Sequence, residues 1–295
     1  MAGLQVLYQF CDSFSFLVLA SIGLAIIYGM MGIINMAHGE FMMVGAYAAT
    51  LMATNGIPLV LAVILAALLT GVYGLIIDRL IIRHLYSRPL DSVVATWGIS
   101  LIMCQGMALL LGPSIQGTST PLGSITVGED SYSIYRILLT LIAIALVVVV
   151  YFVFMHTRFG LKSRATMQLS PIAKSLGVNT DRMYALTFML GSVFAGLAGA
   201  LYAPTMTITP EFGTNFMMQS FVTVIVGGAN PLIGTVLSGA ALGLVDSILS
   251  LLYGTFIGRI GLLAVAILFI RICPKGFSGL VENIRKNRRS KVERN

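Results

Sequence analysis

Charge is scarce in this sequence of 295 residues, because Asp, Glu, Lys and Arg together make up only 10% of it. Hydrophobic residues make up 57%, and the mean hydropathy is +0.94. A soluble domain of this size would need far more charge on its surface, so the composition excludes one. The sequence instead predicts an all-α, polytopic membrane protein.

Cysteine and catalytic motifs are equally sparse. The three cysteines, at positions 11, 104 and 273, stand apart in or beside apolar runs, which fits neither a disulfide framework nor a metal site. No hydrolase, metalloprotease or phosphate-loop motif occurs, and the nearest stretch to a phosphate loop, residues 159–163, lacks the adjoining Gly-Lys pair. We therefore expect no enzyme activity, no metal and no cofactor in this chain. If ATP drives its function, separate subunits bind the ATP and Mg²⁺.

Basic residues are abundant but confined to a few places. Of the 18 Lys and Arg residues, three lie in 79–88, five in 156–183 and eight in 271–294, and only Arg136 and Arg259 lie elsewhere. Clusters beside apolar runs are typical of cytoplasmic loops and of contact with anionic lipid. We therefore expect a membrane partner and no nucleic acid, despite the net charge of +7.

Apolar runs of about 20 residues, long enough to cross about 30 Å of hydrocarbon, recur along the chain. The strong runs are residues 14–34, 57–77, 92–112, 137–155, 184–203 and 232–253, and the weaker ones are 41–53, 216–228 and 260–272. The basic loop 156–183 and the basic C-terminus both indicate the cytoplasm, so an even number of crossings separates them. Residues 216–228 must then cross as a short, tilted or broken helix.

The upstream count leaves two alternatives. If residues 41–53 cross fully, the chain has nine transmembrane helices and an external N-terminus, which we favour; if they re-enter, it has eight and an internal N-terminus. Residues 1–280 form one membrane domain, and residues 281–295 form a basic cytoplasmic tail. The first apolar run lacks a basic leader and a small-residue cleavage site, so we expect it to be retained.

The loop 156–183 contains the pattern of one short helix. Ser170 is the expected N-cap, Pro171 the first helical residue and Gly177 the C-terminal stop. Such a short helix is marginal in water alone. We expect Ile172 and Leu176 to dock on a cytoplasmic partner; the alternative is a structural turn in a connecting loop.

Polar residues gather between two apolar runs at residues 32–40. Asn35, His38 and Glu40 stand there, in a stretch that also contains Gly32 and Gly39. Ionisable groups at membrane depth cost about 2.5–3.5 kcal/mol each, so they tend to face a cavity or a partner. Two interpretations stay open: a cytoplasmic turn in which Glu40 caps the next helix, and a gate on a solute path.

A second polar break occurs at residues 227–234. It contains Asn230 and shares an Asn-x-x-x-Gly pattern with the first break, which suggests an internal repeat. Asp246 stands alone inside the following apolar run. It either lines a solute path or is hydrogen-bonded by a neighbouring helix.

Several stretches of the sequence resemble a known transporter family. They are residues 28–40, 175–182 with 185–188, 227–228 with 234–235, and 274–277. The runs Asn-Met-Ala-His-Gly-Glu and Leu-Gly-Val-Asn-Thr-Asp-Arg are the specific ones, and the resemblance covers nearly the whole chain up to the basic tail. The sequence resembles the permeases of ATP-binding-cassette importers for branched-chain amino acids, a family that also includes urea and short-amide permeases.

This resemblance implies a second permease subunit in a heterodimer, two ATP-binding subunits and an extracytoplasmic solute-binding protein at a bacterial inner membrane. This chain would form the translocation path, with its C-terminus in the cytoplasm. Residues 170–177 would be the coupling helix, followed by Asp181 and Arg182 of the same motif. Because the solute is neutral or zwitterionic overall, we expect neither Glu40 nor Asp246 to be a strong counter-ion for it.

Two alternatives stay open for the solute, and two for the class of transporter. Residues 96–101 and Gln168 resemble the urea branch more than the amino-acid branch, so the sequence favours urea or short amides over branched-chain amino acids. The competing class is an autonomous channel or a secondary transporter for a small polar solute. Against it stand a lack of buried charge pairs for ion coupling and the presence of a capped cytoplasmic helix.

Overall fold

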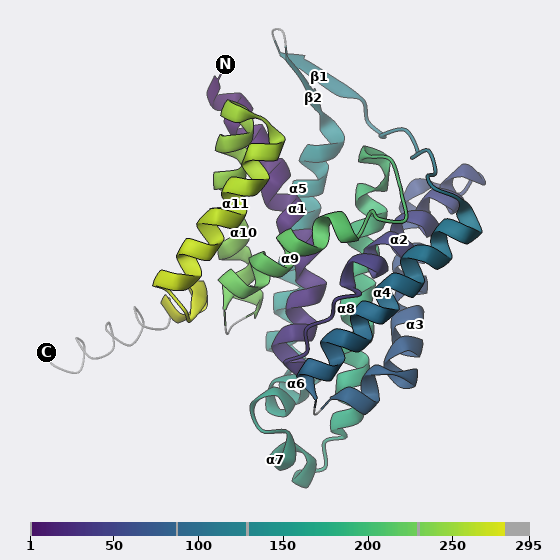
Figure 1. Cartoon of the computed structure of the whole chain (residues 1–295), viewed down its shortest axis with the longest axis vertical. Helices are drawn as coiled ribbons and strands as arrows, with labels where there is room; N and C mark the ends of the chain where they lie inside the picture. The colour runs from purple at the N-terminus through teal and green to yellow at the C-terminus, as the bar shows by residue number, and fades with distance from the viewer. Residues whose placement is uncertain (1, 87, 128–129, 229–230, 281–295) are drawn as a thin grey trace, which may run out of the picture.

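The computed structural model describes residues 2–86, 88–127, 130–228 and 231–280, most of which are helical (Figure 1). The α-helices are α1 (Ala2–Met31), α2 (His38–Thr54), α3 (Leu59–Leu80), α4 (Pro89–Leu111), α5 (Ile134–His156), α6 (Arg158–Gln168), α7 (Ser170–Ser175), α8 (Thr180–Tyr202), α9 (Thr214–Gly227), α10 (Pro231–Tyr253) and α11 (Thr255–Ile272). The short 3₁₀ helices are η1 (Ile82–Leu85) and η2 (Ala203–Thr205). Strands β1 (Ser124–Val127) and β2 (Asp130–Ser133) form an antiparallel hairpin.

Helix lengths separate two of the weak apolar runs from all the other runs. Seven helices of the described chain are long and apolar enough to cross a membrane: α1, α3, α4, α5, α8, α10 and α11. By contrast, α2 has 17 residues and α9 has 14. At about 1.5 Å per residue they reach roughly 25 and 21 Å, short of the ~30 Å hydrocarbon core. The all-α, polytopic class is confirmed, and two of the three weak runs form the shortest membrane helices.

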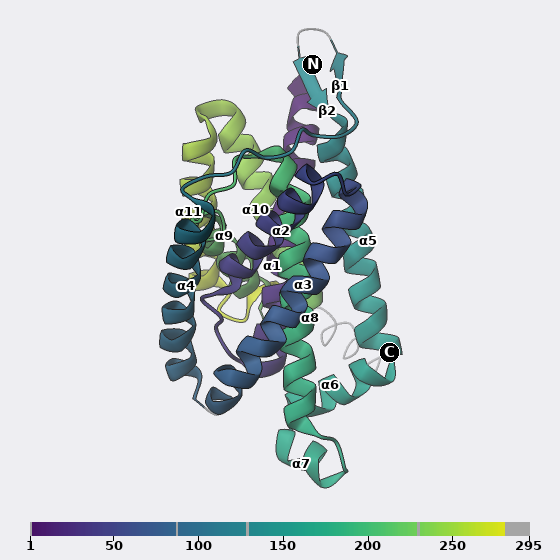
Figure 2. The ribbon, with the colours of Figure 1, turned by 90° about the vertical axis from the view of Figure 1, so that its right-hand side faces the viewer.

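The molecule has two distinct ends (Figures 1 and 2). The hairpin and the N-terminus lie at one, the hairpin end, and α6 and α7 lie at the other, the α7 end. At the hairpin end, the hydroxyl of Tyr8 in α1 accepts a hydrogen bond from the backbone N–H of Ser133 at 3.0 Å. The connection from α4 to α5, which contains the hairpin, and the predicted cytoplasmic loop, 156–183, therefore lie at opposite ends.

The two shorter helices begin in the middle of the molecule, where their N-termini meet (Figure 1). Non-helical residues 32–37 lead from α1 into α2, and residues 206–213 lead from η2 into α9. A Cβ atom on Gly39 would lie 2.5 Å from the carbonyl oxygen of Gly213, and one on Gly213 would overlap the backbone of Gly39. Glycine at both positions is what permits this approach.

The order and packing of the helices indicate an internal repeat, in a register different from the one proposed. The Asn-x-x-x-Gly pattern pairs residues 32–40 with residues 227–234, whereas the second stretch joins α9 to α10. Asn230 itself lies outside the described residues. The structural counterpart of residues 32–40 is residues 206–214, because each leads from a long helix into a short one that starts mid-molecule.

Short sequence motifs that occur in both halves agree with this register. Phe-Met-Met follows the start of each short helix, at 41–43 and 216–218, and Pro-Leu stands at the start of the next long helix, at 58–59 and 231–232. The two halves run in opposite directions (Figure 1), and α3 packs against α8 as α10 packs against α1. Transporters built from inverted repeats place their sites where the repeats meet. The repeat thus directs attention to α2 and α9.

Helix α8 lies at the centre, where small residues allow other backbones to approach. A Cβ atom on Gly196 would collide with Thr70 of α3, and one on Gly199 would overlap the backbone of Met42 in α2. Such close contacts are the main source of packing energy between membrane helices. Large apolar side chains on α3, α4, α5, α10 and α11 instead face outward, as contact with lipid requires.

Candidate functional site

Helix α7 ends as the sequence predicts. Gly177 has a φ of +82°, and its N–H donates to the carbonyl of Lys174 at 3.1 Å. The N–H of Val178 donates to the carbonyl of Ala173 at 3.0 Å. These two bonds form a Schellman motif, which satisfies the last carbonyls of the helix and requires the left-handed backbone that glycine adopts most readily.

The predicted start of α7 is wrong by one residue. Leu169 occupies the N-cap position without a side-chain hydrogen bond, so Ser170 is the first helical residue and Pro171 the second. The cost is small because the first N–H groups of a helix have no intrahelical partner, and Pro171 lacks an N–H in any case. The position of the helix is unaffected.

Apolar side chains of α6 and α7 face away from the rest of the chain. Leu176 is 79% exposed and Ile172 is 52% exposed, whereas Ala173 on the opposite face of α7 is buried. Leu161 and Leu169 are also exposed. A cluster of exposed apolar side chains on an otherwise polar segment is typical of a protein interaction site.

Asp181 and Arg182 lie beside α7, in the first turn of α8, and both are exposed. The side chain of Asn179 caps this helix, because its Oδ1 accepts a hydrogen bond from the backbone N–H of Arg182 at 2.9 Å. The motif therefore ends α7 and caps the start of the long central helix. It contacts neither of the polar sites described next.

The side chains of Asn35, His38 and Glu40 come together around the start of α2, and all three are buried. Asn35 Oδ1 accepts a hydrogen bond from the N–H of Ala37 at 3.1 Å, which closes the turn into α2. His38 Nε2 lies 2.9 Å from the carbonyl oxygen of Ala20 in α1. Since a carbonyl only accepts, we assign the imidazole proton to Nε2.

Glu40 bridges three helices. Its Oε1 accepts hydrogen bonds from the hydroxyl of Ser100 in α4, at 2.5 Å, and from the hydroxyl of Thr214 in α9, at 3.1 Å. Earlier in α4, the hydroxyl of Thr96 accepts a hydrogen bond from the N–H of Met36 at 3.0 Å. The carboxylate lies in the first turn of α2 and beside the first residue of α9, so both helix dipoles favour its negative charge.

We call Asn35, His38, Glu40, Ser100 and Thr214 the central junction. Three of its buried polar atoms have no hydrogen-bond partner among the described residues: Asn35 Nδ2, His38 Nδ1 and Glu40 Oε2. An unpaired buried polar group costs about 1–3 kcal/mol. A cluster of such groups requires an explanation other than stability, and spare donors and acceptors allow hydrogen bonds to be exchanged if α2 and α9 move apart.

A second polar site, the charged pocket, lies nearer to the hairpin end. Its volume is about 230 Å³. It is lined by Gln9, Asp12, Ser13, Phe16, Leu17, Arg136, Tyr202, Thr205, Met206, Phe216, Gln219, Asp246, Ser250, Thr255, Arg259 and Leu262, which come from α1, α5, α8, α9, α10, α11 and the stretch after α8. Two carboxylates and two guanidinium groups therefore share one small pocket.

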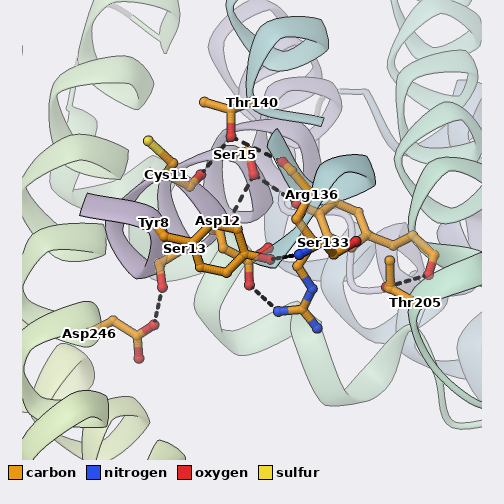
Figure 3. A network of polar contacts seen from close by, with 11 residues as sticks. Tyr8, Cys11, Asp12, Ser13, Ser15, Ser133, Arg136, Thr140, Thr205 and Asp246 are labelled. Carbon is orange, nitrogen blue, oxygen red and sulfur yellow. Dashed lines mark hydrogen bonds and ion pairs between the residues drawn. The ribbon is translucent and has the colours of Figure 1, made fainter. Parts of the chain in front are cut away.

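The two carboxylates of the charged pocket have different partners (Figure 3). Asp12 forms an ion pair with Arg136 at 2.5 Å. Asp246 accepts a hydrogen bond from the hydroxyl of Ser13 at 2.7 Å. In the described part of the chain, neither Asp246 nor Arg259 takes part in an ion pair.

One helix connects the two polar sites. Phe216 and Gln219 of α9 line the charged pocket, while Thr214, at the start of the same helix, binds Glu40. A movement of α9 would therefore change both sites at once. The structure brings Asn35, His38 and Glu40 together and leaves Asp246 in the other site.

The ion pair of Asp12 with Arg136 was missed by sequence reasoning. The available signal was the position of Arg136 and Arg259 outside the three basic clusters, since arginines within membrane helices face cavities or partners. The pair is only partly buried, because the side chain of Asp12 is 17% exposed and that of Arg136 is 39% exposed.

Other side chains offer no metal chemistry within the described ranges. No group of three His, Cys, Asp or Glu residues there is arranged to hold a metal ion. The three cysteines are free thiols, each partly buried. Polar chemistry in the described membrane region is therefore concentrated in the central junction and the charged pocket.

Comparison with known proteins identifies the family. Residues 6–272 match the family described as branched-chain amino acid transport system / permease component. The high-affinity branched-chain amino acid transport system permease protein LivH of Salmonella typhimurium is 27% identical over 281 residues, covering 90% of this chain and 91% of that relative. BraD of Pseudomonas aeruginosa, described in the same words, is 27% identical over 283 residues, covering 90% and 92%.

A more distant similarity extends to another transported solute. The autoinducer 2 import system permease protein LsrC of Yersinia enterocolitica is 30% identical over 221 residues, covering 69% of this chain and 58% of that relative. No solved structure matches. All three relatives are permease subunits, and the family match spans nearly all of the described helices. The chain belongs to the family of permease components of branched-chain amino acid transport systems.

Proposed function

We propose that this chain is the membrane-spanning permease subunit of an ATP-driven importer of branched-chain amino acids in the inner membrane. A second permease subunit, two ATP-binding subunits that hold ATP and Mg²⁺, and an extracytoplasmic solute-binding protein complete the importer. The chain itself hydrolyses no ATP. The observation that carries the proposal is an exposed apolar helix, α7, at the opposite end of a family permease from its charged pocket.

In this proposal α7 is the coupling helix. Ile172 and Leu176 enter a socket on an ATP-binding subunit, while Gly177, Asp181 and Arg182 hold α7 against α8. Because α8 contacts α1, α2 and α3, a displacement of α7 reaches the central junction through rigid helices. The contacts of α8 with α7 and with α2 support such a route.

We also propose a topology of nine crossings, with the N-terminus outside and the C-terminus in the cytoplasm. Residues 32–37 with α2 make one crossing, and residues 206–213 with α9 make another. Each short helix is completed by irregular backbone buried in protein, which is the condition under which such backbone is tolerated at membrane depth. Residues 1–280 would form one domain, and 281–295, outside the described residues, a basic cytoplasmic tail.

The central junction is proposed as the gate of the translocation path. Glu40 ties α2 to α4 and α9 through two hydroxyl groups, and three polar atoms stand ready to exchange partners. Breaking the bond to Thr214 would free the start of α9. We assign Asn35 and His38 to positioning the turn that presents Glu40.

Branched-chain amino acids are preferred over urea as the solute. The relatives LivH and BraD are described as branched-chain amino acid permeases, and the charged pocket combines apolar walls with charges of both signs. Trp97, one of the residues 96–101 that favoured urea, is exposed on α4 and does not line that pocket. Its presence therefore carries no direct information about the solute.

Uptake measurements test this proposal. A strain that lacks this gene should regain uptake of labelled leucine, and not of labelled urea, when the gene is restored. Proteoliposomes should accumulate leucine only when ATP, both ATP-binding subunits, the second permease and the solute-binding protein are present. Leucine flux through this chain alone, without ATP, would instead establish a channel or secondary transporter.

A further inference from the structure

Two opposite charges face the charged pocket without pairing with each other. Asp246 lies on α10 and Arg259 on α11, and the two helices touch here, because a Cβ atom on Gly258 would lie 3.0 Å from the carbonyl oxygen of Asp246. Asp246 is held by the hydroxyl of Ser13 alone, and Arg259 has no carboxylate partner among the described residues. An acid and a base kept apart in one pocket suit a ligand that carries both charges.

The other two charges of the pocket are already satisfied. Asp12 and Arg136 lie 2.5 Å apart, so each neutralises the other. Figure 3 shows that Asp12 and Arg136 point toward each other, whereas Asp246 and Ser13 point toward each other. The pocket therefore offers a solute one carboxylate and one guanidinium group.

Aromatic side chains supply an apolar surface beside these charges. The rings of Phe16 and Phe216 pack edge to face with their centroids 4.8 Å apart. The guanidinium carbon of Arg259 lies 5.9 Å from the centroid of Phe216, so a cation–π contact holds the charge over the ring. At about 230 Å³ the pocket is smaller than the ~300–1,000 Å³ pockets of drug-sized ligands. An amino acid suits this size.

We propose that the charged pocket binds an α-amino acid as a zwitterion inside the permease. Arg259 binds the carboxylate, Asp246 binds the ammonium group, and Phe16 and Phe216 contact the aliphatic side chain. This inference rests on the proposed function for the class of solute and adds the groups that recognise it. It revises the expectation that Asp246 is no counter-ion: a zwitterion is neutral overall, but each of its charges needs a partner once water is removed.

Protection of an introduced cysteine from labelling tests the proposal without replacing any charged residue. Ser250 lines the same pocket. In the assembled importer, with the three native cysteines replaced by alanine and the solute-binding protein omitted, Ser250→Cys is labelled with a small thiol reagent. Leucine should slow the labelling. Leucinamide, which lacks the carboxylate, and 4-methylpentanoate, which lacks the ammonium group, should slow it far less at equal concentration.

Charge variants then assign the two groups. Asp246→Asn and Arg259→Gln should each raise the leucine concentration for half-protection about tenfold or more, because each removes a charge-assisted hydrogen bond. The matched controls Arg88→Gln and Asp91→Asn disrupt an exposed ion pair, 3.7 Å long, at the start of α4. They should leave half-protection unchanged.

Two outcomes would overturn the zwitterion site: equal protection by leucine and its two analogues, or no protection by leucine at all. The thiol control Ser119→Cys, exposed in the loop after α4, should be labelled equally fast with and without leucine. Failure of the complete, unsubstituted importer to take up leucine would count against the proposed function instead. The two kinds of failure are therefore separable.

Discussion

Glu40 and Asp246 are both isolated carboxylates in apolar sequence, and the structure gives them opposite surroundings. Glu40 is buried where α2 meets α9, with Ser100 and Thr214 bound to one of its oxygens. Asp246 faces a pocket, with the hydroxyl of Ser13 as its partner. A carboxylate thus bridges helices in one site and faces an open pocket in the other. What lies opposite a membrane carboxylate, rather than its position in the sequence, indicates its role.

The largest expected effect comes from forcing α2 and α9 apart at the central junction. Gly213→Ala would place a methyl group on the backbone of Gly39, so α9 could not approach α2. We expect a loss of about 3 kcal/mol or more, at the upper end of overpacking costs, and a collapse in the yield of folded complex. The control Gly98→Ala lies in a helix with open space around it and should be neutral or stabilising by about 0.5–1 kcal/mol. Equal yields would show that the junction is not tightly packed.

The next prediction concerns α7, through which the ATP-binding subunits are proposed to act on both polar sites. Leu176→Asp places a charge on the most exposed apolar side chain of α7, so transport and co-purification of the ATP-binding subunits should fall more than tenfold while the yield of this chain is kept. Ile125→Asp adds the same charge at the hairpin end and should leave co-purification intact. Undiminished uptake by Leu176→Asp would rule out docking through α7.

A smaller expected effect distinguishes a gating role of Glu40 from a purely structural one. Glu40→Gln keeps the shape of the side chain but removes its charge, which weakens its bonds to Ser100 and Thr214. As a gate, Glu40→Gln should change transport per folded complex several-fold, or let ATP hydrolysis proceed without transport, with stability altered by about 1 kcal/mol. Thr214→Val, which removes one donor, should act in the same direction. A shift in thermal stability alone, with unchanged turnover, would assign Glu40 a structural role.

The smallest effect on transport is expected at a third carboxylate, which sharpens the comparison. Asp78, at the end of α3, is buried, and the hydroxyl of Tyr86 lies 2.7 and 2.9 Å from its two oxygens. Burial, together with the Asp78 carboxylate, raises the pKa of Tyr86 well above its ordinary value of 10.0. The stability from this protonated hydroxyl is therefore complete below about pH 10 and is lost as the pH rises further. Tyr86→Phe should lower stability by about 1–3 kcal/mol at neutral pH, flatten the alkaline loss, and leave transport per complex unchanged.

Much of the architecture could be predicted from the sequence, because hydropathy and charge act locally. The long apolar runs became membrane helices, and Gly177 ended α7 where its neighbours required a left-handed residue. Among the weak runs, 260–272 lies in the long helix α11, whereas 41–53 and 216–228 correspond to the short helices α2 and α9. Their meeting point could not be predicted, because contact between Gly39 and Gly213 depends on how distant helices fold back together.

The sites were only half accessible to sequence reasoning. Asn35, His38 and Glu40 could be predicted because polar residues within an apolar stretch of sequence are easy to recognise. Ser100 and Thr214 were missed because hydroxyl groups are common in membrane helices and bond their own backbone when no tertiary partner is present. The wrong register of the repeat had a similar cause: Asn-x-x-x-Gly is a short pattern, whereas helix direction decides which breaks correspond.

The most direct test of the contrast between an open pocket and a closed junction is thiol labelling from the hairpin side. Ser250→Cys lies in the charged pocket, and Thr96→Cys is buried beyond Ser100, nearer the start of α4. With the native cysteines removed, an impermeant reagent added outside should label Ser250→Cys and not Thr96→Cys, and adding Glu40→Gln should make Thr96→Cys reactive. Equal labelling of both positions in the chain with Glu40 intact, or no change at Thr96→Cys when Glu40 is replaced, would contradict the account.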